Sequence, residues 1–289
     1  MREKISINTA AQRRWQALTL RVTLAFVVAC IPAGLAAQVS VDELEVHMRL
    51  AEKRESITQT IPVRNDDTKP QQVRILVGDW TRDSLGNNMF LESGAVSESC
   101  GDRIKAFPTT FQVAPGATEL VRVSYDPAPE DVGCWSIVFV ETVTPPPTRP
   151  TGEGSFLTIE IRTGVKIYVH RPNEVALGEV QEITVDTAWR ARPAVGSAPR
   201  DTMLVREVTV RFANTGTAHL RVKSSLEIRS VLGELLREVE GPEAPMTPGS
   251  LRLVRIATPT LPPGEYIAVM LLDYGGDEIS AAQIDFRVP

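Results

Sequence analysis

The segment FLTIEIRTGVKIYV, residues 156–169, shows the pattern that decides the fold of this chain. Leu157, Ile159 and Ile161 alternate with polar residues. After Gly164 the apolar residues stay at odd-numbered positions. Successive side chains of a β-strand point to opposite faces of a sheet, so the segment is predicted to be one long strand with one apolar face. In most proteins such a face fills the core of its own domain.

Similar segments follow one another along the rest of the chain, separated by turns rich in Asn, Asp, Gly and Pro. The sequence contains 21 Pro and 19 Gly, a mixture that favours short strands and turns over long helices. No segment keeps a 3.6-residue apolar period long enough for a helix, although residues 231–239 fit either a strand or a helical turn. We therefore predict an all-β chain.

The two halves of the chain repeat each other weakly. Asn65 and Asn214 each end a predicted strand, and the Pro-Gly pairs at residues 115–116 and 248–249 each precede another. Features in the same order indicate two copies of one plan, and each copy has the length of an immunoglobulin-like sandwich. Residues 171–173 resemble a hinge. The prediction is two immunoglobulin-like β-sandwich domains in tandem, residues 38–172 and residues 173–289.

Composition excludes several classes of protein. With 43% apolar and 23% charged residues, the chain is typical of a globular protein rather than a disordered chain, a coiled coil or a multispanning membrane protein. The formal net charge of −5 leaves no basic excess for binding nucleic acid.

Residues 1–37 have the pattern of a secretory signal peptide. Basic residues come first, a short apolar run covers residues 22–31, and the small residues Ala36 and Ala37 precede the expected cleavage. The residues around Cys30 also resemble the lipobox of bacterial lipoproteins, which is the less favoured alternative. Either way we expect export, with the periplasm as the destination.

Export leaves Cys100 and Cys134 as the cysteines of the mature chain. In an oxidising compartment two such cysteines most simply form one disulfide bond, worth roughly 3–4 kcal/mol in the chain-entropy model. A metal pair or a redox pair is disfavoured, because the spacing is not C-x-x-C and no histidine cluster is evident in the sequence.

The sequence contains no recognisable catalytic motif. The three histidines, His47, His170 and His219, each stand alone in a strand-like context. There is no nucleophile elbow, zinc-protease motif, phosphate loop or dinucleotide fingerprint. Carboxylates are numerous enough to suggest a glycosidase pair, but an acidic surface explains them better. We expect no enzyme, no cofactor, no metal and no small-molecule substrate.

With the leader, the two sandwich-like halves and the strand at residues 156–169, the chain resembles the periplasmic pilus-assembly chaperones of the chaperone–usher pathway (PapD-like). The resemblance is carried by residues 39–172, and the C-terminal half shares only the architecture. In that family alternating apolar residues of the corresponding strand bind pilus subunits, and a following lysine binds the subunit's terminal carboxylate. The matching residues here are Leu157, Ile159, Ile161 and Lys166.

The resemblance implies a function in pilus (fimbrium) assembly and the cell envelope. A pilus subunit lacks its last strand, so a donated strand completes its sheet while a cationic anchor sets the register. The implied partners are pilin-like protein subunits and an outer-membrane usher. The alternative is a non-catalytic structural or adhesive module of the cell envelope.

One position departs from the family. In those chaperones an arginine of the first strand also binds the subunit's terminal carboxylate. The corresponding residue of this chain is Glu45, with Arg49 and Lys53 nearby. If the alignment holds, Glu45 and Lys166 lie close together between the domains. A glutamate there neutralises the lysine and repels an incoming carboxylate.

Overall fold

The computed structural model describes residues 39–51, 55–127, 133–143, 161–191 and 202–289. The expected signal peptide, Cys30, Lys53, Leu157 and Ile159 lie outside these residues. Among the described residues the only helical segment is one 3-10 turn, η1 (Gly101–Arg103). No helix in this part of the chain is long and apolar enough to cross a membrane.

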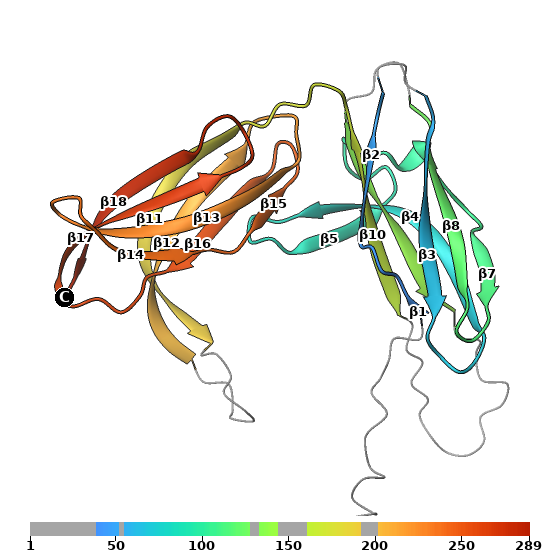
Figure 1. Ribbon diagram of the computed structural model, residues 1–289, viewed down its shortest axis with the longest axis horizontal. Helices are drawn as coiled ribbons and strands as arrows, with labels where there is room; N and C mark the ends of the chain where they lie inside the picture. The colour runs from blue at the N-terminus through green and yellow to red at the C-terminus, as the bar shows by residue number, and fades with distance from the viewer. Residues whose placement is uncertain (1–38, 52–54, 128–132, 144–160, 192–201) are drawn as a thin grey trace, which may run out of the picture.

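The first half of the chain forms a sandwich of two sheets whose strands are mainly antiparallel (Figure 1). One sheet has four strands, in the order β1 (Val39–Ser40), β3 (Ile57–Asn65), β8 (Thr118–Tyr125) and β6 (Ile104–Phe107). The other has six, in the order β2 (Glu45–Arg49), β10 (Arg162–His170), β9 (Cys134–Thr142), β4 (Gln71–Arg82) and β5 (Asn88–Glu92), with β7 (Thr110–Val113) also paired to β4.

Alternation along the strands builds the core of this sandwich. Val165, Ile167 and Val169 of β10 are completely buried and pack with other apolar residues between the two sheets. Strand β9 is buried on both faces, because Trp135 and Phe139 belong to a second cluster on the outer face of the six-stranded sheet. Gly164 allows the close approach on this outer face, since a Cβ there would lie 2.6 Å from Cδ1 of Ile137.

The second half forms another sandwich. Its smaller sheet contains β11 (Gly178–Ala191), β12 (Thr202–Asn214) and β16 (Leu251–Ala257). Its five-stranded sheet contains β14 (Leu235–Glu240), β13 (Leu220–Ser230), β17 (Gly264–Asp273) and β18 (Ser280–Val288), with β15 (Ala244–Met246) paired to β13. A separate buried cluster fills this sandwich, so the predicted all-β fold with two immunoglobulin-like sandwiches is confirmed.

The two asparagines of the sequence repeat have the same structural role. The Nδ2 group of Asn65 donates to the carbonyls of Lys69 and Val113, at 2.8 and 2.9 Å. That of Asn214 donates to the carbonyls of Ala218 and Thr247, at 2.9 and 3.1 Å. Each asparagine therefore joins its own turn to a neighbouring loop, which explains why the same landmark occurs once in each half.

The structure settles one of two expectations about strand limits, and the other lies partly outside the described residues. Residues 235–240 form strand β14, so the open question about residues 231–239 is settled mainly in favour of a strand. Strand β10 is described only from Arg162, and the expected earlier part of that strand, up to residue 160, lies outside the described residues.

The two sandwiches are set at an angle and meet beside β10, β5 and β15 (Figure 1). The end of β4 and the turn after it contact the second sandwich. The guanidinium of Arg82, the last residue of β4, donates to the Pro245 carbonyl at 2.9 Å, and the Leu253 amide donates to the Ser84 carbonyl at 2.8 Å. The junction between them therefore has direct polar contacts as well as the covalent connection from β10 to β11.

Candidate functional site

The face of β10 opposite the core borders the junction between the sandwiches. Strand β2 pairs with β10 in parallel, and the register places Lys166 beside Glu45 and Tyr168 beside His47. Because side chains alternate, burying the odd-numbered residues of β10 in the core turns these even-numbered residues outward. One alternating pattern therefore produces both the core and the site.

A cleft of about 320 Å³ lies between the two sandwiches at this face. The first sandwich contributes polar and aromatic side chains from β2, β4 and β10, and the second contributes residues from β13, β15 and the loops beside them. The lining residues used below are Glu45, His47, Trp80, Tyr168, His170, His219 and Arg221.

Lys166 lies beside this cleft and is largely withdrawn from solvent, with 13% of its side chain exposed. Its ammonium group is 4.5 Å from the centre of the Trp80 ring and 3.9 Å from Oε1 of Glu45. Burial lowers the pKa of Lys166, and the nearby guanidinium of Arg82 adds to this effect, while Glu45 opposes it. The structure thus places Glu45 and Lys166 close together between the sandwiches.

Glu45 also connects the first sandwich to the second. Its other carboxylate oxygen forms an ion pair with Arg221, which also pairs with Glu243 at 2.8 Å. The hydroxyl of Tyr168 donates a hydrogen bond to Glu45 at 3.4 Å, and burial raises the pKa of this hydroxyl. Arg221 is exposed by 55%, so its pair with Glu45 is screened by water.

The carboxylate of Glu45 therefore lies between one cation from each sandwich, Lys166 and Arg221. Sequence reasoning identified Lys166 and Glu45 but not Arg221. The position of Arg221 depends on how the second sandwich is oriented, and no local pattern in the sequence encodes this.

The strand next to the cleft has an open edge. Strand β2 pairs with β10 only from Lys166 onward, whereas β9 pairs with β10 along its whole length from Arg162. In the part of the chain that the structure describes, residues 162–165 therefore have a partner strand on one side only. Just before them, half-buried Ile161 is held to β9 by the Thr142 amide, which donates to the Ile161 carbonyl at 3.1 Å.

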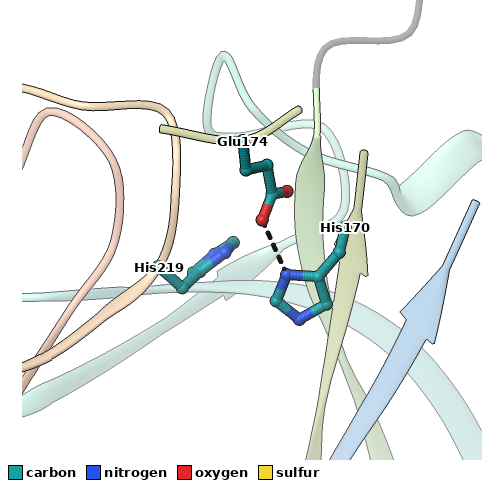
Figure 2. A group of neighbouring side chains, drawn as sticks. All are labelled: His170, Glu174 and His219. Atoms are coloured by element: carbon teal, nitrogen blue, oxygen red, sulfur yellow. Dashed lines mark hydrogen bonds and ion pairs between the residues drawn. The ribbon is translucent and has the colours of Figure 1, made fainter. Parts of the chain in front are cut away.

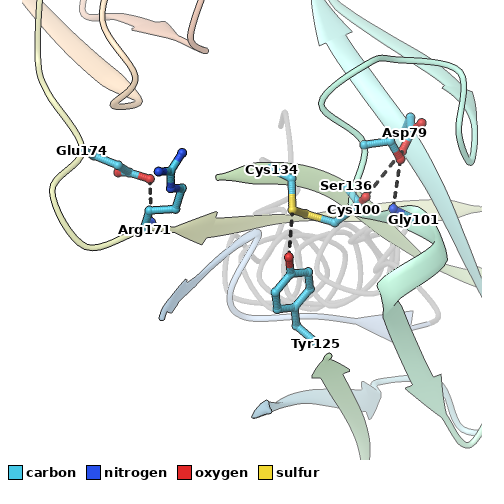
Figure 3. Close-up of a disulfide and its surroundings, with 9 residues drawn as sticks. Asp79, Cys100, Gly101, Tyr125, Cys134, Ser136, Arg171 and Glu174 are labelled. Carbon is cyan, nitrogen blue, oxygen red and sulfur yellow. Dashed lines mark hydrogen bonds between the residues drawn. A yellow bond between two sulfur atoms is a disulfide. The ribbon is translucent and has the colours of Figure 1, made fainter. Parts of the chain in front are cut away.

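The expected disulfide bond between Cys100 and Cys134 is present (Figure 3). The two Cα atoms are 5.3 Å apart, and both residues are buried. The bond joins the loop before η1 to the start of β9, and the hydroxyl of Tyr125 lies 3.6 Å from Sγ of Cys134. This cross-link holds the end of β9 that lies nearest the second sandwich.

The histidines are not isolated, contrary to the sequence interpretation. Nδ1 of His47 lies 2.8 Å from Nε2 of His170, and the ring of His219 packs edge-on against that of His170, with 5.4 Å between ring centres. Burial lowers the pKa of His219 to about 4, with His170 contributing. Alternation along β2 puts His47 on the same face as Glu45, and alternation along β10 puts His170 on the same face as Lys166, so both histidines face the cleft. His219 comes from the other sandwich, and the sequence contains no sign of its contact with His170.

No protein-family model matches the sequence, and neither does any curated protein sequence. Solved structures with a similar arrangement include a chain of a chaperone–tip adhesin complex of CFA/I fimbriae biogenesis, with 12% identity, TM-score 0.47, and coverage of 86% of this chain and 98% of that one. The YadV chaperone has 12% identity, TM-score 0.42 and coverage of 87% and 100%. The Escherichia coli chaperone DraB has 16% identity, TM-score 0.41 and coverage of 87% and 97%. These three chains match over most of their length at 12–16% identity, so the likeness lies in the fold and not in the sequence.

Proposed function

We propose that this protein is a periplasmic chaperone that holds secreted, pilin-like subunits by donating a β-strand to them. The open edge of β10 at residues 162–165 is the observation that carries the proposal. Unpaired amide and carbonyl groups at a sheet edge are a template for an added strand. Leu157, Ile159 and Ile161 come immediately before this edge and have the alternation that a subunit lacking its last strand needs.

The cleft lies farther along β10, at Tyr168 and His170, and supports a role for the neighbouring Lys166 as the anchor of an incoming terminal carboxylate. Such a carboxylate would have to displace Glu45 from Lys166 and Arg221, because Glu45 is within ion-pair distance of both cations. Arg221 then replaces the arginine that chaperones of this kind carry on the first strand. Anchoring in this protein would therefore depend on both sandwiches.

The proposal includes the organisation inferred from the sequence. Residues 1–37 act as the export signal, residues 38–172 form the subunit-binding domain, and residues 173–289 form the second domain. An outer-membrane usher would accept the bound subunit. No step requires catalysis, since strand exchange forms and breaks only non-covalent contacts.

A paired measurement tests strand donation. The Ile159→Asp/Ile161→Asp variant and wild type are compared by thermal unfolding, and by recovery of bound subunits from the periplasm with identification by mass spectrometry. Thr158→Asp, a change of a polar residue on the other face of the predicted strand, is the matched control. We expect near-normal unfolding and loss of subunits in the double variant, with both properties retained in the control.

Hydrogen exchange provides a second, independent measurement. Amides of residues 162–165 that point away from β9 should exchange fast in the free protein and become protected in a complex with a recovered subunit. An unfolded first sandwich in the double variant would mean that Ile159 and Ile161 belong to its core. Unchanged recovery of subunits would favour a structural or adhesive module instead.

A further inference from the structure

His219 has an unusual environment at the junction of the two sandwiches. Both of its ring nitrogens are inaccessible to solvent, and neither has a hydrogen-bond partner among the described residues. A buried polar atom without a partner costs free energy, typically about 1–3 kcal/mol. Such a nitrogen is a ligand position when other donor atoms face it.

Two other donor groups face His219 (Figure 2). His170 is the last residue of β10, and its Nδ1 lies 2.9 Å from Oε2 of Glu174 in the connection between the sandwiches. Both side chains are largely buried, with 10% and 13% exposed. One donor atom from each of His170, Glu174 and His219 lies within 4.8 Å of the others.

We propose that His170, Glu174 and His219 bind a divalent transition-metal ion of the zinc type at the junction of the two sandwiches. Two imidazoles and one carboxylate are a donor set that suits Zn²⁺, and three protein ligands leave one position open for water or a further ligand. The three ligands come from the first sandwich, the connection and the second sandwich, so the ion would link all three.

The hydrogen bond between His170 and Glu174 is compatible with this site. In the metal-free protein a proton lies between Nδ1 of His170 and the carboxylate, and for a metal to bind at Nδ1 the hydrogen of the neutral ring has to move, by exchange with solvent, from Nδ1 to Nε2. Nε2 of His170 then carries the ring hydrogen and donates to Nδ1 of His47, at the 2.8 Å already present. His47 is therefore a positioning residue that orients a ligand.

The second carboxylate oxygen of Glu174 is already held in place. The backbone amide of Arg171 donates to this oxygen, Oε1, at 2.9 Å. Binding through Oε2 would leave that hydrogen bond intact. The carboxylate is thus oriented before any metal arrives, which reduces the conformational freedom lost on binding.

Metal binding would draw the two sandwiches together. Ligand atoms about 2.1 Å from a tetrahedral zinc ion lie roughly 3.4 Å from one another, closer than the 4.8 Å limit seen here. Because His170 and Glu174 are already 2.9 Å apart, His219 is the ligand that has to approach, by rotation of its side chain and a small closure of the junction. We expect the metal to restrict the angle between the sandwiches.

The test measures binding of Zn²⁺ to the untagged, chelator-treated full chain by isothermal titration calorimetry. His219→Gln, His170→Ala and Glu174→Gln remove one ligand each. His47→Ala changes the remaining histidine of the sequence, and Glu278→Gln changes an exposed carboxylate of the second sandwich. Circular dichroism without metal establishes which variants are folded, and only these are compared.

We expect one Zn²⁺ per chain in wild type, at least tenfold weaker binding in every folded ligand variant, and no change in Glu278→Gln. His47→Ala should keep the stoichiometry. Co²⁺ in place of Zn²⁺ should give the visible absorption of tetrahedral coordination in wild type but not in His219→Gln. Absence of zinc binding in wild type, or equal binding in wild type and His219→Gln, would overturn the proposal.

Discussion

Glu141 shows how one buried carboxylate ties three strands together. It lies on β9 with 3% of its side chain exposed, and it pairs with Arg74 of β4 and Arg162 of β10. Burial alone would raise the pKa of Glu141, but the hydrogen bonds from the two arginines outweigh it and lower the pKa below the ordinary value of 4.5. The charged form is therefore the one that the fold stabilises.

The lowered pKa of Glu141 predicts a pH dependence. A carboxylate with a lowered pKa in the folded state contributes stability that is fully present above its ordinary value and is lost as the pH falls through the lowered one. Glu141→Gln should cost about 1–3 kcal/mol at neutral pH. Urea unfolding measured from about pH 6 to about pH 3 gives the free energy of unfolding of wild type and variant. The difference between the two free energies should become smaller below pH 4.5. A difference that stays constant with pH would contradict this account.

At the scale of the element, β10 has two faces with different environments. Val165, Ile167 and Val169 fill the first core, whereas Tyr168 and His170 line the cleft between the sandwiches. Towards its N-terminal end the neighbouring strand β2 is no longer present, and Ile161 is only half buried. The same strand thus changes from a structural element to an open edge within a few residues.

This change predicts that shortening a side chain lowers the stability of the protein by different amounts at the two ends of this segment. Ile167→Ala removes a fully buried side chain and should destabilise the protein by about 2–5 kcal/mol. Ile161→Ala should cost much less, because water already reaches part of that side chain. Chemical denaturation of both variants against wild type measures the difference, and similar losses at the two positions would show that Ile161 packs as a core residue.

At the scale of the whole molecule, polar and aromatic contacts set the orientation of the two sandwiches. Glu45 pairs with Arg221, Tyr168 packs against His219 with 4.8 Å between ring centres, and Arg82 reaches the Pro245 carbonyl. Such an interface is more polar than a domain core, and interfaces of this kind generally allow relative motion of the domains.

Glu45→Gln should therefore loosen the junction more than it destabilises the fold. The pair with Arg221 is solvent-exposed, so its loss should contribute at most about 1 kcal/mol to unfolding, and the loss of the 3.9 Å pair with Lys166 adds to this. Small-angle X-ray scattering should nevertheless show a wider distribution of shapes than in wild type. Glu243→Gln, which leaves the Glu45 pair in place, is the control. An unchanged scattering profile in Glu45→Gln would mean that other contacts hold the angle.

The sequence by itself determined the fold class and part of the site. The period of two fixes which residues of each strand face inward, and the paired landmarks at Asn65 and Asn214 reveal the repeat, because both are local properties of the backbone. The same alternation, with the resemblance, brought Lys166 and Glu45 together. Only the tertiary structure decided that Arg221 and His219 join them. Those two residues belong to another sandwich, and the contacts depend on an angle between domains that no pattern along the chain encodes.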